Sequence, residues 1–463
     1  MMKRRTAGSV GAFVRRLTIC PTTGLPHETG TGTTICDHAC GAIVATAHHQ
    51  GDLVSLQPSA AGFDAQRLDR IATHLEHRYL GPGKIAGCEV AVGRRGLLAY
   101  RQSFGQRDRE RSIPIGDDTI FRIYSMTKPI TSIALMQLFE QGMFQLDDPV
   151  SRFFPSWREH RVWVSGAGDD MVTEPATRRV TFRDLLTHTG GLTYGGGLPG
   201  LGDQHPVDAV YRSMQIRSAG VQTTMEEFMD KLGQVPLRYQ PGTAYMYSLA
   251  TDACGALVER ISGVPFAEYL QHNIFDPLGM IDTSFQVAPE KIERFAANYS
   301  RNPDKTTTLF DDPTTSAFTR PPAFFSGGGG LTGTTADYIR FCEMLRQGGE
   351  LDGHRIIGPR TLDLMRMNHL PGGKDLASLD VALLAEYGSV GVGFGLGFAS
   401  TIDQVATGAL TRGDFYWGGA ASTVFWVDAV EDMWVIFMTQ LMPSASFDFR
   451  GQLRSLVYSA IID

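Results

Sequence analysis

The sequence predicts a mixed α/β (α+β) fold in which both ends of the chain build one β-sheet and a mainly helical domain is inserted between them. Strand patterns occur at residues 85–105 and again from residue 392 onward, whereas helical and loop patterns dominate the middle of the chain. We therefore expect an α/β domain formed by residues 57–155 and 325–463, and a mainly helical inserted domain formed by residues 156–324.

The N-terminal segment 1–56 is expected to be a poorly ordered leader or the result of a start codon placed too early. It contains basic residues but no apolar core of the kind that a secretory signal requires, so we expect a cytoplasmic protein. Cys36 and Cys40, together with His48 or His49, match no standard zinc-binding spacing, and we expect no metal site there. The six cysteines are too few and too scattered for a disulfide framework in a chain of 463 residues.

The overall composition is that of a globular protein. Hydrophobic residues make up 43% of the chain, which is enough for one large core or two smaller ones. A formal net charge of -7 gives no reason to expect binding to nucleic acid. No stretch approaches the roughly 18 consecutive apolar residues of a membrane span.

The ordered part is predicted to open with a helix. Asp64 is a plausible N-cap, and Leu68, Ile71, Leu75 and Tyr79 recur at helical spacing. The next segment, IAGCEVAVGRRGLLAYRQSFG, is typical of two strands around a tight turn. The chain ends with an amphipathic helix in FRGQLRSLVYSAII.

Another helix is predicted from Ser125 to a stop at Gly142. Pro129 fits this helix only in the first turn, where its missing N–H has no helical partner to lose. Lys128 follows Ser125 by three residues, so both side chains lie on one face of the helix. Lysine is rare in this chain, which makes a lysine beside a hydroxyl a candidate for chemistry.

A serine hydroxyl becomes an effective nucleophile when a nearby base takes its proton. Lys128 can be that base only when it is neutral, so its surroundings must lower its pKa from about 10.4. We expect Ile123, Tyr124, Met126 and Ile130 to provide an apolar wall for this purpose. The helix N-terminus also favours negative charge on the serine oxygen. A bare Ser-x-x-Lys pattern is common by chance, so further motifs are needed.

Four further motifs follow in order along the chain. FRIYSMTKPI, LLTHTGGLTYG, PGTAYMYS, GGGGLTGTTADYIRF and WGGAASTVFWVD together resemble the serine β-lactamase and penicillin-binding-protein superfamily. Within it, the chain is most similar to the family VIII carboxylesterases, which are related to class C β-lactamases. The resemblance covers about residues 60–460 and implies a β-lactamase-like antiparallel sheet flanked by helices.

The resemblance implies that Ser125 is the nucleophile, that Lys128 is its base and that Tyr247 is the second-motif tyrosine. Tyr247 would relay a proton between the serine, the lysine and the leaving group. Tyr245 lies two residues earlier, where the family has a packing aromatic residue. No cofactor is implied.

The third motif is Trp417-Gly418-Gly419, where most lactamases have Lys-Thr-Gly. Glycine lets the backbone approach a substrate closely. By the family pattern, the N–H of Ala420 would pair with that of Ser125 as the oxyanion hole. The residues that we expect to contact the substrate are Trp417, Gly418, Gly419, Leu249, Tyr124 and Met126.

Two departures from the lactamase pattern favour an ester substrate. Lactamases tend to use the third-motif lysine and a second-motif asparagine as polar handles for the drug, and Trp417 and Leu249 replace them. Each unpaired polar group of a bound β-lactam would cost roughly 1–3 kcal/mol. We therefore expect a serine carboxylesterase for small-molecule esters with short acyl chains or an aromatic alcohol. Leu249 also leaves open how Lys128 is oriented.

Other interpretations remain open or are less favoured. An acyltransferase would use the same acyl-enzyme, a β-lactam or amide hydrolase is disfavoured by Trp417 and Leu249, and a silent penicillin-binding sensor has little need for all three catalytic residues. No Gly-x-Ser-x-Gly elbow occurs. We expect a structural role for His188, a tight turn at Gly327–Gly330 and a turn capped by Asp147-Asp148.

Overall fold

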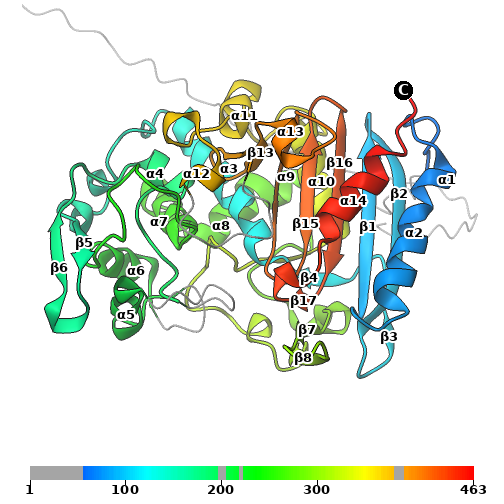
Figure 1. The fold of residues 1–463 in the computed structure, drawn as a ribbon, viewed down its shortest axis with the longest axis horizontal. Coiled ribbons are helices and arrows are strands. Elements are labelled where there is room, and N and C mark those ends of the chain that lie inside the picture. Colours follow the sequence, from blue (N-terminus) through cyan, green and yellow to red (C-terminus); the bar gives the residue numbers. More distant parts are fainter. Residues whose placement is uncertain (1–55, 197–204, 218–222, 380–389) are drawn as a thin grey trace, which may run out of the picture. The chain divides into compact units, whose positions relative to one another are not determined.

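The computed structural model describes residues 56–196, 205–217, 223–379 and 390–463. Residues 53–463 form one compact unit (Figure 1). The predicted leader, apart from residue 56, and the Cys36–His49 group lie outside the described residues. The boundaries at residues 156 and 324 stay a prediction, because no separate unit is resolved between them.

An eight-stranded sheet forms the centre of the unit, and every neighbouring pair in it is antiparallel. Its order is β12 (Val392–Phe394), β13 (Ala399–Thr401), β14 (Asp414–Gly418), β15 (Val424–Asp428), β16 (Met433–Thr439), β1 (Gly87–Arg94), β2 (Leu97–Asp108) and β3 (Ile113–Pro114). The strand β1 therefore lies between its own hairpin partner and the C-terminal strand β16. This topology confirms the predicted α/β fold with one antiparallel sheet built from both ends of the chain.

The hairpin between β1 and β2 shows why these residues turn tightly. Arg95 and Gly96 connect the strands, with φ values of 55° and 75°. Two successive residues with positive φ are the geometry of a type I′ turn, whose twist matches that of the flanking strands. The predicted tight turn is confirmed.

Helices cover both faces of the sheet, as Figure 1 shows for α14. On one face, Phe449 of α14 (Phe449–Tyr458) packs against Phe437 of β16, with ring centroids 5.0 Å apart. On the other face, Tyr338 of α10 (Thr335–Arg346) packs against Phe425 of β15, also at 5.0 Å. Side chains of a strand alternate between the two faces of the sheet, so the same strands can contact the helices on both faces.

The N-terminal helices begin where the sequence predicts. Asp64 is the N-cap of α1 (Ala65–Leu68) and accepts a hydrogen bond from the N–H of Arg67 at 3.2 Å. The chain continues through α2 (Arg70–Leu75) and a π-helical turn (Glu76–Leu80). The predicted apolar positions of these helices are all buried.

Helices and small sheets share the middle of the chain. The helices are α4 (Phe182–Leu186), α5 (Pro206–Ser213), α6 (Met225–Leu232), α7 (Ala250–Ser262), α8 (Phe266–Leu270) and α9 (Asp276–Leu278). The strands are β5 (Arg161–Ser165) paired with β6 (Val172–Pro175), and β7 (Asn298–Arg301) paired with β8 (Thr307–Asp311) and with the later β17 (Leu441–Met442). These strands are short and partly polar, which is why the sequence showed no strand pattern there.

The remaining elements follow the inserted region. They are β10 (Glu350–Leu351), β11 (His354–Arg355), α11 (Pro359–Arg366), α12 (Leu376–Leu379) and α13 (Gln404–Thr407). No helix in the described part of the chain combines the length and apolar character needed to cross a membrane.

Helix α3 (Thr127–Glu140) is a core helix that packs against α7. Eleven of its 14 residues are buried, so it has no distinct solvent face. Pro129 occupies the third position of this helix, inside the first turn, as predicted. The helix ends at Glu140, and Gly142 follows with a φ of 73°.

Candidate active site

Ser125 lies on a single 3₁₀ turn (Tyr124–Met126) that leads directly into α3. The strand before it, β4 (Ile120–Arg122), pairs with β9 (Thr332–Thr334) and so fixes the entry to the turn. Tyr124 has a φ of 41°, a conformation that costs a non-glycine residue energy and that the surrounding structure must hold in place. Ser125 is partly exposed, and its N–H belongs to a first helical turn, whose N–H groups have no intrahelical partner.

Lys128 reaches the serine as the three-residue spacing predicts. Its Nζ lies 3.1 Å from Ser125 Oγ and donates a hydrogen bond to the carbonyl oxygen of Gly328 at 2.6 Å. The side chain is buried, and burial lowers the pKa of Lys128 from 10.5 to about 7, although the negative charge of Asp252 opposes that change. A substantial fraction of neutral lysine is therefore present at neutral pH.

Tyr247 covers the lysine from the segment just before α7. The Lys128 ammonium lies 4.5 Å from the centroid of the Tyr247 ring. The indole N–H of Trp417 donates to Tyr247 Oη at 3.3 Å, and Tyr194 shares a hydrogen bond with Tyr247. Donors directed at the phenolic oxygen stabilise negative charge on it. Ser125, Lys128 and Tyr247 are thus brought together from two helix starts.

Tyr245 occupies a different environment. It is fully buried, and its ring packs against Phe394 at 5.3 Å. Its N–H donates to the carbonyl of Leu379 at 3.1 Å. These contacts fit the packing role expected for Tyr245.

The third motif lies at the end of β14, beside the turn that carries Ser125. A Cβ on Gly419 would lie 2.5 Å from the carbonyl oxygen of Ile123, so only glycine permits this close approach. Ala420 is partly exposed, and none of the hydrogen bonds among the described residues uses its N–H. That N–H is available to a developing oxyanion.

The aromatic residues around the site form one connected wall. Trp417 is buried, and its ring lies 5.4 Å from that of Tyr247 and 5.2 Å from that of Phe394. Tyr194 completes the wall, with its ring 5.4 Å from Tyr247 and 5.6 Å from the lysine nitrogen. Burial raises the pKa of Tyr194 well above its usual value, so this phenol keeps its proton.

The other expected substrate contacts differ in exposure. Tyr124 is partly exposed beside the serine, and its hydroxyl accepts a hydrogen bond from Asn298 at 3.1 Å. Met126 and Leu249 are completely buried, and Leu249 is the N-cap of α7. Their contact with substrate stays a prediction, whereas their packing against the core is observed.

His188 lies behind Tyr247, with ring centroids 4.9 Å apart. Its ring nitrogens are 3.3 Å from Ser248 Oγ and 3.5 Å from Thr251 Oγ1. Burial holds the pKa of His188 well below its usual value, and the positive charge of Lys128 lowers it further. The ring therefore stays neutral. This environment agrees with a structural role for the histidine.

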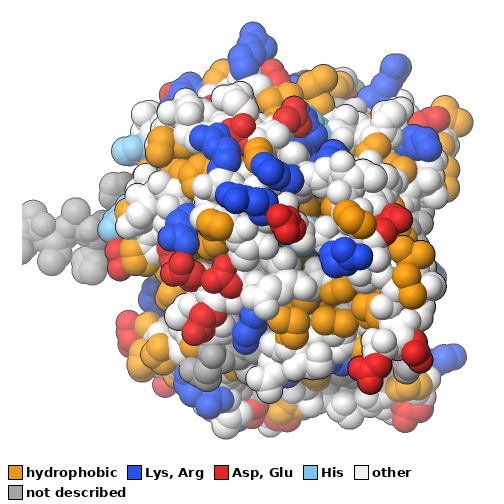
Figure 2. All heavy atoms as spheres, turned by 90° about the vertical axis from the view of Figure 1, so that its left-hand side faces the viewer, with side chains coloured by type: hydrophobic (Ala, Val, Ile, Leu, Met, Phe, Trp, Pro, Cys, Tyr) orange, Lys and Arg blue, Asp and Glu red, His pale blue; other side chains and the backbone are white. Residues whose placement is uncertain are grey.

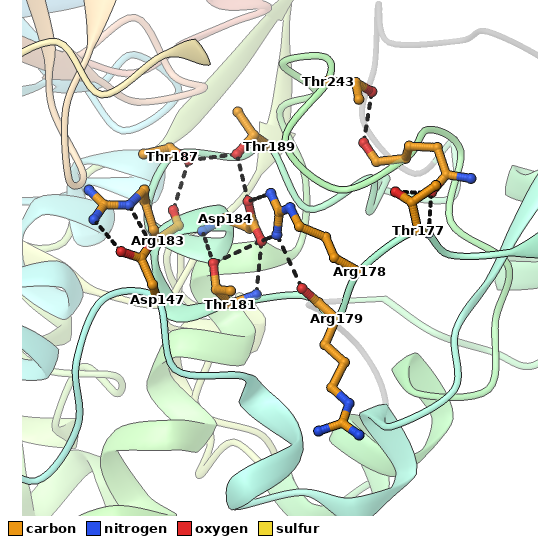
Figure 3. Close-up of polar contacts among 11 residues, drawn as sticks. Asp147, Thr177, Arg178, Arg179, Thr181, Arg183, Asp184, Thr187, Thr189 and Thr243 are labelled. Carbon is orange, nitrogen blue, oxygen red and sulfur yellow. Dashed lines mark hydrogen bonds and ion pairs between the residues drawn. The ribbon is translucent and has the colours of Figure 1, made fainter. Parts of the chain in front are cut away.

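A network around Asp184 holds the His188 turn in place (Figure 3). Asp184 accepts two hydrogen bonds from Arg178, at 2.6 Å and 2.8 Å, and two from Thr181. Thr189 adds another at 3.3 Å. The capping box between Thr181 and Asp184 also begins helix α4.

The turn held by this network in turn fixes the Tyr247 segment. The carbonyl of His188 accepts the N–H of Met246 at 2.8 Å, and that of Thr189 accepts the N–H of Gly242 at 2.8 Å. Two backbone bonds therefore tie residues 242–246 to the turn.

Three participants were not predicted from the sequence. Tyr194 contacts the lysine and Tyr247, the carbonyl of Gly328 binds the lysine, and Asp252 binds the N–H of Gly328 at 3.2 Å. Tyr194 and Gly328 lie in motifs that the sequence did reveal, LLTHTGGLTYG and GGGG, but their contacts cross between motifs. Nothing in the sequence of either motif indicates these contacts.

The molecular surface carries charged side chains of both signs. On the face shown in Figure 2, basic and acidic side chains are interspersed.

Comparisons with known proteins show what this chain resembles. A family model described as Beta-lactamase matches residues 71–458. Esterase EstB from Burkholderia gladioli is 30% identical over 404 residues, which cover 83% of this chain and 93% of that protein.

Solved structures give the same result. EstCE1, described as a hydrolase with promiscuous acyltransferase activity, superposes with a TM-score of 0.68 at 27% identity, covering 86% of this chain and 99% of that one. Simvastatin synthase from Aspergillus terreus superposes with a TM-score of 0.69 at 25% identity, covering 86% and 97%.

Proposed function

The chain belongs to the β-lactamase family, and on that premise we propose that it is a serine carboxylesterase acting on short-chain or aromatic esters through an acyl-enzyme. One observation carries the proposal: a buried lysine with a pKa lowered to about 7 lies 3.1 Å from a partly exposed serine oxygen at the start of a helix. A lysine in that state can take the serine proton.

In the acylation step, neutral Lys128 takes the proton of Ser125 Oγ as the oxygen bonds to the ester carbonyl carbon. The carbonyl oxygen becomes an oxyanion, which the N–H groups of Ser125 and Ala420 would stabilise. Tyr247 then gives a proton to the departing alcohol oxygen, regains one from Lys128, and leaves an acyl-Ser125 ester.

Deacylation reverses these roles. A water molecule loses one proton, which passes through Tyr247 to Lys128, as its oxygen attacks the acyl carbon. The tetrahedral intermediate then collapses, the bond to Ser125 Oγ breaks, and Ser125 recovers its proton. The products are a carboxylic acid and the regenerated serine.

The side chains that replace the lactamase handles support the choice of an ester. Trp417 and Leu249 offer no partner for the carboxylate and amide of a β-lactam, at a cost of roughly 1–3 kcal/mol for each unpaired group. An apolar ester loses no such partner and can use the aromatic wall around Tyr247.

The test compares hydrolysis of p-nitrophenyl acetate, p-nitrophenyl butyrate and nitrocefin by the wild-type chain and the Ser125→Ala variant. We expect ester turnover that falls by at least about 10³-fold in the variant. Ser132→Ala is the matched control, because it removes a buried serine hydroxyl from the same helix outside the Ser125–Lys128 pair. Full activity of Ser125→Ala, or faster hydrolysis of nitrocefin than of the esters, would contradict the proposal.

Acyl transfer is the second candidate function, favoured by the similarity to EstCE1 and simvastatin synthase. An alcohol would then replace water in the second step and form a new ester. Product analysis of p-nitrophenyl butyrate turnover with added alcohol measures this. Transfer products exceeding free butyrate would assign the chain to the acyltransferases, and free acid alone would leave it an esterase.

A further inference from the structure

A buried carboxylate lies next to the Lys128 site and has no part in the proposed chemistry. Asp252 is the third residue of α7 and is completely buried. Its Oδ1 accepts hydrogen bonds from Ser326 Oγ at 2.5 Å and from the N–H of Gly328 at 3.2 Å. Within the described residues, Oδ2 has no hydrogen-bond partner. A buried carboxylate oxygen without a partner is costly, so its presence requires an explanation.

Gly328 connects this carboxylate to the lysine. Its N–H binds Asp252, and its carbonyl oxygen accepts the hydrogen bond from Lys128 Nζ at 2.6 Å. A Cβ on Gly328 would lie 2.4 Å from Asp252 Oδ2, and one on Gly327 would lie 2.7 Å from the carbonyl of Thr251. Neither glycine has a positive φ, so close contact with the start of α7 is what requires glycine here.

Resting on the proposed function, we propose that Asp252 is a positioning residue for Lys128. It fixes Gly328, whose carbonyl holds the lysine amine beside Ser125 Oγ. Leu249, which stands in place of the second-motif asparagine of lactamases, has no polar group that could orient the lysine. The orientation of Lys128 therefore comes from a carboxylate one helical turn further along α7.

The charge of Asp252 has a second effect on the same lysine. The groups that face the Lys128 amine are Asp252, His188, Tyr194, Tyr247 and Ser125. Burial raises the pKa of Asp252, and the charge of Lys128 and the hydrogen bonds from Ser326 and Gly328 oppose that rise. His188 and Tyr194 stay neutral, so the ionised Asp252 carboxylate is the charge that favours the ammonium form. Removing that charge should lower the pH at which Lys128 loses its proton.

The experiment measures two pH profiles for wild type, Asp252→Asn and Asp252→Ala. One is kcat/KM for p-nitrophenyl butyrate, and the other is the rate at which a fluorophosphonate labels Ser125. Asparagine keeps an acceptor oxygen for Ser326 and Gly328 but removes the charge. We expect the acid limb of both profiles to move to lower pH in Asp252→Asn, and kcat to fall about tenfold or more in Asp252→Ala with little change in KM.

Asp337→Asn is the matched control. Asp337 is also buried and also occupies the third position of a helix, α10, where it binds Thr283 and the N–H of Asp282. This substitution should change the free energy of unfolding but not the acid limb.

The outcomes separate the two proposals. A wild-type chain that neither labels at Ser125 nor hydrolyses the ester overturns the proposed function itself. A wild-type chain that labels and hydrolyses, with a folded Asp252→Asn variant that keeps the wild-type acid limb and kcat, overturns only the role of Asp252. An equal shift in Asp337→Asn also overturns it.

Discussion

The lysine beside the serine determines how the activity should depend on pH. Lys128 acts as a base only in its neutral form, and burial lowers its pKa to about 7. Below that pH the lysine is protonated and activity should fall. Above it, kcat/KM should approach a plateau, because the free enzyme then holds the neutral base. The kcat/KM profile for p-nitrophenyl butyrate should therefore have an acid limb centred near pH 7.

The same reasoning predicts the effect of Lys128→Arg. Arginine keeps the positive charge but cannot lose its proton in a protein, so ester turnover should drop by at least about 10³-fold. Steady-state assays at pH 8, with circular dichroism to verify folding, provide the measurement. A folded Lys128→Arg variant with near wild-type turnover would show that another group is the base.

The two tyrosines that precede α7 should respond differently to loss of their hydroxyl groups. Tyr247 lies over Lys128 and accepts the Trp417 N–H, whereas Tyr245 packs against Phe394. Tyr247→Phe should lower kcat by about 10²-fold or more, as expected for loss of a general acid–base. Tyr245→Phe, the matched control, should keep kcat within a few-fold. The reverse order would assign the proton relay to Tyr245.

At this scale, the sequence predicted the residues that lie close together along the chain. The contact between Ser125 and Lys128 follows from a three-residue spacing on one helix. Asp252, Tyr194 and Gly328 could not be predicted, because their contacts with Lys128 depend on how separate segments fold against α3.

Among the secondary-structure elements, the capping box of α4 and its arginine should contribute measurably to stability. Arg178 makes two hydrogen bonds to the buried carboxylate of Asp184. Arg178→Ala should lower the free energy of unfolding by about 1–3 kcal/mol, because it leaves that carboxylate without its cation. Urea denaturation measures the change.

Arg179→Ala is the control for this substitution. Figure 3 shows the Arg179 guanidinium pointing away from Asp184, and only its backbone carbonyl contacts Arg178. We expect a change within about 0.5 kcal/mol, as for most surface substitutions. Equal losses in both variants would show that the Asp184 network contributes no more than general surface charge.

Some of the secondary-structure elements could be predicted from the sequence, and others could not. The long apolar helices and the sheet strands were recognisable from their periodicity. The hairpin of β5 and β6 was not, because its side chains are largely exposed and carry little apolar alternation. The 3₁₀ turn that bears Ser125 was predicted only as a helix start. A 3₁₀ turn and the first turn of an α-helix differ in their local hydrogen bonds, which the spacing of apolar residues does not reveal.

For the molecule as a whole, the sheet order predicts one cooperative unfolding transition for residues 53–463. The strand β1 lies between β2 and β16, so the sheet cannot form without both ends of the chain. Val457→Ala on α14 removes buried apolar surface and should lower the free energy of unfolding by about 2 kcal/mol. Near-ultraviolet circular dichroism and residual esterase activity should lose signal at the same urea concentration.

Val405→Ala tests the same substitution at an exposed position. Val405 is 91% exposed on α13, so this change should leave the midpoint of the urea unfolding transition almost unchanged. If Val457→Ala shifts the circular dichroism transition but not the loss of activity, the site and the C-terminal helix belong to separately unfolding parts.

The overall topology followed from the order of patterns along the chain, because strands at both ends with helices between them leave few ways to build one sheet. The strand order within that sheet, and the short parallel pairing of β17 with β7, depend on tertiary contacts that no local pattern records.

Trp417 couples the substrate specificity of the site to the support of Tyr247. The resemblance predicts that Trp417 stands where most lactamases have a lysine, and its indole donates to Tyr247 Oη and packs against the rings of Tyr247 and Phe394. A Trp417→Lys substitution meant to admit carboxylate-bearing substrates would therefore remove a support of the proposed proton relay. Evolution from this chain toward a β-lactamase would need compensating changes around Tyr247 before position 417 could change.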